Sequence, residues 1–394
     1  MSHSHSHAHD HGHSHDHSHS HSHDHAPPPP YPHTSTTNQQ FDDDNDAREQ
    51  AHHQATVVAT FDTYRLAALH ANQRRRSDYY RLPAAHRALL PDYPALLNEV
   101  DEKLEVNAEF VRKVIEQNPF PPPEDAALDA KAPGEGDHER LRSTLRQCVR
   151  DWSEAGKHER DTTYKPILAA LEKAFPNLSP TERAQTKVLV PGAGLGRLAW
   201  EVVRAGFSCQ ANEFSLHMLI TSSYLLNHTS VPNSIPLHPY IHTFSNTRTK
   251  ADLLEPVYVP DVNPEEISGS EAEFSFAAGD FLELYGEDEG SWDSCITCFF
   301  LDTAQNIVAY LLTIYKLLKP GGYFVNLGPL LWHFENDREG TSIELTLGEA
   351  KALARRIGFE IEDEREIVTN YTTNPKSLLR HEYTAAFWTA RKKA

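Results

Sequence analysis

The sequence predicts an α/β protein with a mostly parallel, doubly wound sheet, preceded by a helical region and a His-rich segment. Three observations predict this fold. A short apolar run at residues 188–190 leads into three closely spaced glycines, a helical stretch begins at Arg197, and a second apolar run ends at the acidic Glu213. Short apolar runs of this kind are typical of strands that are buried on both faces of a parallel sheet.

Residues 1–46 have the composition of a disordered tail and linker. A His stands at every odd position from His3 to His25, and a Pro run and a polar, acidic run to Asp46 follow. Such a segment cannot bury enough apolar surface to offset the entropy of ordering it. Besides a solvated tail, weak Zn²⁺, Ni²⁺ or Cu²⁺ binding is a second interpretation, because neutral imidazole is a common metal ligand.

Residues 47–137 are predicted to form an N-terminal helical region that ends in a Pro-rich linker. Val57, Phe61, Tyr64 and Ala68 recur at the spacing of one helical face. Prolines and acidic residues at 119–137 then interrupt the pattern. We assign residues 138–394 to the α/β domain.

Composition excludes several classes of protein. The net charge of −19 argues against binding nucleic acid, which relies on neutralising phosphates. The sequence has no apolar run long enough for a membrane helix and no signal-peptide core near its start. Four cysteines in 394 residues fit a reducing compartment, so a cytoplasmic location is expected, with the nucleus left open. Cys295 and Cys298 would face opposite sides of one strand, so we predict no metal site there.

The glycine spacing indicates the cofactor. Gly192, Gly194 and Gly196 form Gly-x-Gly-x-Gly, which is typical of S-adenosylmethionine (SAM) sites, whereas dinucleotide sites use Gly-x-Gly-x-x-Gly. Glu213 follows at about 20 residues, where a carboxylate can accept hydrogen bonds from ribose hydroxyls. A simple tight turn and a dinucleotide-dependent oxidoreductase are the alternatives.

The end of the chain narrows the fold class. A strand is predicted at 292–301, a helix at 307–318 that is stopped by the Lys-Pro-Gly-Gly segment 319–322, and a strand at 323–327. Residues 359–368 and 383–390 read as two strands with no crossover helix between them. An antiparallel strand at the end of a mostly parallel sheet is typical of the Rossmann-like fold of class I SAM-dependent methyltransferases.

Polar residues follow the later strands, where ligands bind in open α/β sheets. Asp280 and Phe281 offer a carboxylate and a ring suited to adenine, Asp302 follows the strand of Cys298, and His333 follows the next strand. Each has a structural alternative. Asp302 is a candidate helix N-cap, and His333 is a candidate core histidine. By its sequence alone Tyr383 reads as an ordinary strand residue.

Four segments, 143–154, 188–199, 298–304 and 326–336, resemble the carnosine N-methyltransferase family, a branch of the class I SAM-dependent methyltransferases. The resemblance covers roughly residues 47–394. It implies methyl transfer from SAM to the pros imidazole nitrogen of carnosine or a related dipeptide, giving anserine from carnosine. The residues implied to bind SAM are Gln147, Arg150 (toward the SAM carboxylate), Gly192, Gly194, Glu213, Asp280, Phe281 and Cys298. Asp302, His333 and Tyr383 are implied to bind the dipeptide and to take part in catalysis.

Two positions depart from the family pattern on the substrate side. Gln305 stands where a His is expected, and His381 stands where a Tyr is expected. A methyltransferase acting on peptide or protein histidine is therefore an alternative. A metal-buffering or scaffold protein that merely binds SAM is the non-enzyme alternative. The sequence leaves the oligomeric state open, a homodimer included.

Overall fold

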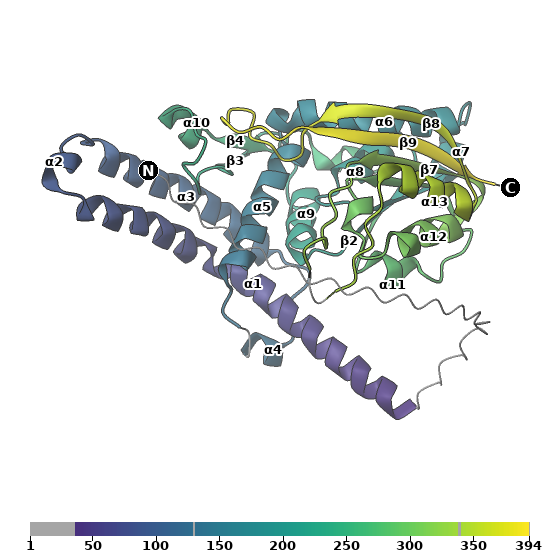
Figure 1. The fold of residues 1–394 in the computed structure, drawn as a ribbon, viewed down its shortest axis with the longest axis horizontal. Coiled ribbons are helices and arrows are strands. Elements are labelled where there is room, and N and C mark those ends of the chain that lie inside the picture. The colour runs from purple at the N-terminus through teal and green to yellow at the C-terminus, as the bar shows by residue number, and fades with distance from the viewer. Residues whose placement is uncertain (1–35, 129–130, 338–339, 394) are drawn as a thin grey trace, which may run out of the picture. The chain divides into compact units, whose positions relative to one another are not determined.

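The computed structural model describes residues 36–128, 131–337 and 340–393 (Figure 1). The chain divides into two compact units, residues 1–47 and residues 48–394. Of the first unit, the structure describes the beginning of helix α1 (Thr36–Arg81). The His-rich run lies outside the described residues. The structure therefore does not test the disorder or the metal binding predicted for it.

The second unit is built on a sheet whose strands lie in the order β5-β2-β1-β6-β7-β9-β8. The strands are β1 (Lys187–Pro191), β2 (Ser208–Glu213), β5 (Phe274–Ala278), β6 (Trp292–Cys298), β7 (Leu318–Gly328), β8 (Phe359–Thr369) and β9 (Tyr383–Lys392). Every pairing among β5, β2, β1, β6 and β7 is parallel, whereas β9 runs antiparallel to both β7 and β8. The predicted antiparallel ending of a mostly parallel sheet is confirmed.

Helices cover both faces of the sheet. Side chains of α6 (Lys157–Ala174) and α8 (Arg197–Arg204) pack on one face. The other face is covered by α11 (Phe281–Tyr285), α12 (Ile307–Leu317) and α13 (Leu347–Ile357). Cys295 and Cys298 belong to opposite apolar layers, as the strand period predicted.

Helices α1 and α3 (Tyr93–Glu116) lie side by side as a hairpin (Figure 1). Asn72 donates a hydrogen bond across the hairpin to the carbonyl of Leu97 at 2.8 Å. The apolar face of the hairpin shares one core with α5 (Glu135–Trp152) and α9 (Leu216–Asn227). The remaining elements are α2 (Ala84–Arg87), α4 (Glu124–Leu128), η1 (Glu154–Gly156), α7 (Pro180–Gln185), β3 (Ile235–Leu237), α10 (Lys250–Leu254), β4 (Val257–Val259), η2 (Pro264–Ile267) and η3 (Leu301–Thr303).

Three predicted boundaries are wrong. Helix α1 begins at Thr36, so residues 36–46 are helical rather than linker, because adding a residue to an existing helix costs far less than starting a new one. The predicted linker 119–137 contains α4 and the first residues of α5. Strand β7 already begins at Leu318, so residues 319–322 lie within its bounds rather than in a turn before it.

Candidate active site

The glycine turn after β1 has the conformation that its sequence predicts. Gly192, Gly194 and Gly196 have φ angles of +64°, +57° and +80°, in the left-handed region that favours glycine. At Gly192 space is limiting as well, because a Cβ there would lie 2.4 Å from Cδ2 of Phe300. The turn therefore brings bare backbone to the carboxyl end of β1.

Glu213, the last residue of β2, is joined to this turn. Its Oε2 accepts a hydrogen bond from the Gly194 amide at 2.8 Å, and its Oε1 accepts from the amides of Phe214 and Ser215 at 3.0 and 2.9 Å. Burial raises the pKa of Glu213 above its usual value, while the three amides act in the opposite direction. Oε2 accepts only one of these amides and has a second lone pair, so the group can still accept a ligand hydroxyl.

Helix α5 presents Gln147 and Arg150 on one face, and Asp151 holds both. Gln147 Nε2 donates to Asp151 Oδ2 at 3.1 Å, and Arg150 Nη1 donates to Asp151 Oδ1 at 2.9 Å. Arg150 also forms an ion pair with Glu159 at 2.9 Å. A Cβ on Gly194 would lie 3.5 Å from Gln147 Nε2, so α5 and the glycine turn meet at this point.

Asp151 and Tyr371 are parts of the site that the sequence analysis missed. Asp151 is 1% exposed and serves as the common acceptor for the two α5 side chains. The Tyr371 ring lies 4.8 Å from the Arg150 guanidinium and 4.7 Å from the Phe299 ring. Asp151 directly follows Arg150 in the motif, a signal that was available. Tyr371 comes from the β8–β9 connection, and nothing local in the sequence marks it.

Cys298 ends β6 beside Arg150, with its Sγ 3.9 Å from Arg150 Nη2. Burial raises the pKa of the Cys298 thiol to about 11, so it is protonated at neutral pH and is not a nucleophile. The next residue, Phe299, has a φ of +56°, which is uncommon for a residue with a side chain. The strand thus turns sharply at the edge where it meets the site.

Asp280 and Phe281 differ in what they can offer a ligand. Asp280 caps α11, because its Oδ1 accepts from the amides of Leu282 and Glu283 at 2.8 and 3.2 Å. Phe281 is 3% exposed, and its ring centroid lies 5.5 Å from that of Phe300. Its ring is therefore enclosed in the core, and the prediction that its face serves an adenine ring does not fit this packing.

Tyr310 in α12 is a further residue that the sequence analysis missed. Its ring stacks on Phe300 with centroids 5.0 Å apart. Burial raises the pKa of Tyr310, and the carboxylates of Asp280 and Glu213 act in the same direction. Its hydroxyl group therefore lies in the field of two of the predicted cofactor residues. Its place in the first turn of α12, the helix that follows β6 and η3, was the only sequence signal.

Asp302 lies in η3 just beyond β6 and is 3% exposed. Its Oδ2 accepts from the Leu331 amide at 2.9 Å, and its backbone carbonyl accepts from the His333 amide at 3.1 Å. Burial raises the pKa of Asp302, whereas the Leu331 amide and His333 act against that rise. The alternative of a helix N-cap is wrong, because Asn306 caps α12.

His333 and Tyr383 reach the same edge of the sheet from different strands. His333 is exposed in the turn after β7, so it is not a core histidine. Tyr383 opens β9, whose residue Ala386 pairs with Gly328 at the end of β7, and antiparallel pairing carries Tyr383 beyond that end. The Tyr383 ring centroid is 5.8 Å from that of Phe299.

Both departures from the expected substrate pattern are exposed. Gln305 is an exposed residue just after η3, and its carbonyl accepts from the Ile343 amide at 3.0 Å. His381 lies two residues before Tyr383, and its carbonyl accepts from Asn370 Nδ2.

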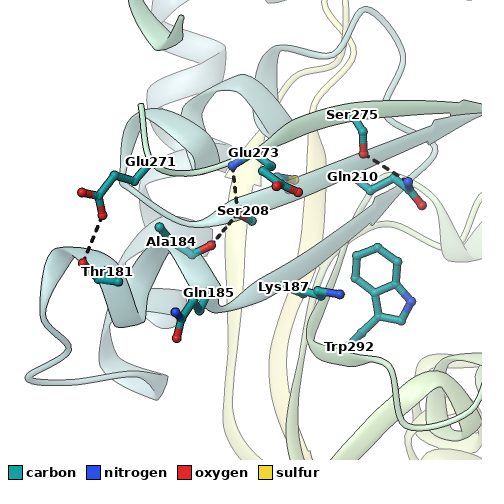
Figure 2. A pocket seen from close by; sticks show the side chains of 11 residues that line it. Thr181, Ala184, Gln185, Lys187, Ser208, Gln210, Glu271, Glu273, Ser275 and Trp292 are labelled. Atoms are coloured by element: carbon teal, nitrogen blue, oxygen red, sulfur yellow. Dashed lines mark hydrogen bonds between the residues drawn. The ribbon is translucent and has the colours of Figure 1, made fainter. Parts of the chain in front are cut away.

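A cavity of about 480 Å³ lies at the opposite edge of the sheet (Figure 2). Lys187, Ser208 and Trp292, the first residues of β1, β2 and β6, line it. In open α/β sheets ligands bind at the carboxyl ends of the strands. This cavity is therefore not the candidate active site.

The chain is a class I methyltransferase by its fold: a mostly parallel sheet with an antiparallel last strand, a glycine turn after β1 and an acidic residue at the end of β2. Residues 129–394 match the family model described as carnosine N-methyltransferase. The chain belongs to the carnosine N-methyltransferase family.

Curated relatives agree with this assignment. The carnosine N-methyltransferase of Mus musculus is 39% identical over 357 residues, which is 89% of this chain and 88% of the relative. The carnosine N-methyltransferase of Schizosaccharomyces pombe is 37% identical over 362 residues, or 85% of this chain and 94% of the relative. A dinucleotide-dependent oxidoreductase and a non-enzymatic scaffold are both set aside by this membership. No helix among the described residues is long and apolar enough to cross a membrane.

Proposed function

We propose that this chain transfers the methyl group of SAM to the pros nitrogen of the carnosine imidazole, giving anserine. The observation that carries the proposal is the buried carboxylate of Asp302. One of its oxygens is fixed by the Leu331 amide, and it lies at the edge of the sheet that His333 and Tyr383 also reach. The relatives named as carnosine N-methyltransferases supply the substrate class.

The residues at the carboxyl ends of β1 and β2 suit SAM. The glycine turn presents backbone without a side chain at Gly194, while Glu213 can accept hydrogen bonds from ribose hydroxyls. Asp280 uses one oxygen to cap α11 and has the other available for the adenine amino group. Gln147 and Arg150 would hold the amino-acid end, with the Arg150 guanidinium facing the SAM carboxylate. When bound, SAM supplies an electrophilic methyl group on a sulfonium.

Asp302 has the central role in this mechanism. A free imidazole has a pKa of about 6.5, so at neutral pH most acceptor rings already carry a lone pair, and no strong base is needed. Asp302 accepts a hydrogen bond from the N–H of the ring nitrogen that is not methylated, which fixes the reactive tautomer. As the pros nitrogen bonds to the methyl carbon and the carbon–sulfur bond breaks, the ring becomes cationic, and the carboxylate stabilises that charge.

His333 and Tyr383 orient the acceptor beside Asp302. The exposed His333 is tied through its amide to the Asp302 carbonyl, so its position follows that of the carboxylate. Tyr383 is fixed by pairing of β9 with β7 and β8 rather than by a flexible loop. Alignment of a nucleophile for in-line attack contributes about 7–11 kcal/mol to catalysis when the geometry is well held.

The decisive experiment is to incubate the purified chain with SAM and carnosine and to place any added methyl group by NMR after mass spectrometry. Methylation at the pros nitrogen is expected. Methylation at the other ring nitrogen would contradict the orientation proposed for Asp302, and no product despite SAM binding would contradict the substrate.

Histidine in a peptide or protein is the second candidate acceptor. The observation that favours this candidate is that Gln305 and His381 depart from the family pattern and are exposed beside the proposed substrate site. Histidine-containing peptides should be assayed in parallel with carnosine, and a higher kcat/KM for the peptides would replace the first proposal by the second.

A further inference from the structure

A second recess adjoins the candidate active site under the connection between β8 and β9. It has a volume of about 340 Å³, within the usual range for small-molecule sites. Helix α5, the start of α6 and residues 370–382 contribute its walls. The charged and imidazole side chains that line it are those of Arg146, Arg150, His158, Glu159, Arg380 and Glu382.

Most of the buried charge in this recess is already paired within the protein. Arg146 donates to Glu139 at 2.7 Å. Arg150 is held by Asp151 and Glu159, each at 2.9 Å. Glu159 in addition accepts from the Thr372 amide at 3.0 Å, which attaches the β8–β9 connection to α6. These groups shape the recess, and each of them already has a partner within the protein.

Arg380 and Glu382 are different. Within the described part of the chain, neither side chain forms a hydrogen bond or an ion pair, and they do not pair with each other. Between them, the carbonyl of His381 accepts a hydrogen bond from Asn370, so the backbone that carries both charges is fixed to the end of β8. One wall of the recess thus presents a positive and a negative group, both without a protein partner.

We propose that this recess is the subsite for the two main-chain charges of a zwitterionic imidazole dipeptide. Arg380 binds the α-carboxylate and Glu382 binds the terminal ammonium group. This inference rests on the proposed function. It follows from chemistry, since a free β-alanyl dipeptide carries one negative and one positive end, whereas a histidine inside a peptide chain has neutral amides there. Two opposite charges without protein partners on one wall match the free dipeptide and not a histidine within a peptide chain.

The position of the recess agrees with this role. Glu382 is followed directly by Tyr383, so the segment that carries the two charges leads into a residue proposed to orient the imidazole. Arg150 lines the recess and also lies 3.9 Å from Cys298 at the end of β6, so the recess borders the residues proposed to bind SAM.

The test compares substrates that each lack one charge. The full chain and its Arg380→Gln and Glu382→Gln variants are assayed with SAM and with carnosine, the C-terminal amide of carnosine, or N-acetylcarnosine. Arg380 and Glu382 are both exposed, and an exposed ion pair changes affinity by about fivefold at most. We therefore expect KM to rise by up to about fivefold when either side chain, or the ligand charge that it binds, is removed. Arg380→Gln should raise KM for carnosine and leave KM for the amide unchanged. Glu382→Gln should raise KM for carnosine and leave that for N-acetylcarnosine unchanged.

Matched controls come from exposed charges outside the recess. Arg356→Gln on α13 and Glu366→Gln on β8 should leave every KM within twofold. The assignment of Arg380 would be overturned if Arg380→Gln left the KM for carnosine unchanged, or raised KM equally for carnosine and its amide. The assignment of Glu382 would be overturned if Glu382→Gln left the KM for carnosine unchanged, or raised KM equally for carnosine and N-acetylcarnosine.

Calorimetric binding of carnosine to the chain with S-adenosylhomocysteine present separates this inference from the proposed function. Charge-dependent binding by Arg380 and Glu382 without methyl transfer would refute the function and support the subsite. Methyl transfer to carnosine with no discrimination among the three ligands would support the function and refute the subsite.

Discussion

Replacing Asp302 by Asn should remove most of the turnover while leaving the fold and SAM binding intact. The amide oxygen of Asn can still accept the 2.9 Å hydrogen bond from Leu331, so the 331–333 turn keeps its attachment. What disappears is the carboxylate charge of a residue that is 3% exposed and that we propose stabilises the developing imidazolium. Removing one such preorganised group typically costs about 2.7–4 kcal/mol, so kcat should fall roughly 10²- to 10³-fold.

The assay is steady-state methyl transfer to carnosine, with SAM affinity measured by calorimetry. Asp293→Asn is the matched control. That carboxylate also accepts one backbone amide, from Lys187 at 2.9 Å, but it lies at the opposite edge of the sheet. Turnover within threefold of the unaltered chain in Asp302→Asn would remove Asp302 from the mechanism. An equal loss in Asp293→Asn would show that the assay reports stability rather than chemistry.

Three further changes test other parts of the site and fold. Glu213→Gln should weaken SAM binding about tenfold in calorimetry, because a charged acceptor for the ribose is lost; unchanged affinity would refute that role. Gly192→Ala should lower the free energy of unfolding by about 1–3 kcal/mol in urea titration, because its φ is +64° and the new Cβ would meet Phe300; an unaltered midpoint would show that the turn can relax. Burial lowers the pKa of His242 to about 3, with two nearby arginines acting in the same direction. The unfolded state therefore binds the proton more readily, and stability should fall as the pH drops below about 6.5, by up to about 1.4 kcal/mol per unit. His242→Gln should flatten that dependence, and an identical slope in the variant would assign it to other groups.

Local sequence was sufficient for the parts of the site that depend on one segment. The turn at Gly192 and the acid at Glu213 follow from backbone requirements and strand spacing, and both are confirmed as structural features. The antiparallel ending was predictable because two strands without a helix between them cannot be joined as a parallel pair.

Residues recruited from distant segments were not predictable in the same way. Tyr371 contacts Arg150 across the fold, and no periodicity marks it. The ring of Phe281 was assigned to a ligand by its neighbourhood in the sequence, but packing against Phe300 turns it into the core. The SAM and dipeptide roles of the individual residues remain predictions. The start of α1 was missed because a polar run gives no amphipathic signal even when it continues a helix.

The connection between β8 and β9 is anchored at both ends by pairing, because Thr369 and Tyr383 are register partners. Changes in the length of residues 370–382 would therefore alter the reach and charge of the recess without moving the tyrosine at its end. A one-residue slip within β9, in contrast, would turn Tyr383 to the other face of the sheet. Acceptor preference in this scaffold should thus be open to redesign by grafting the later part of the connection, while Tyr371 and Thr372 keep their contacts with Arg150 and Glu159.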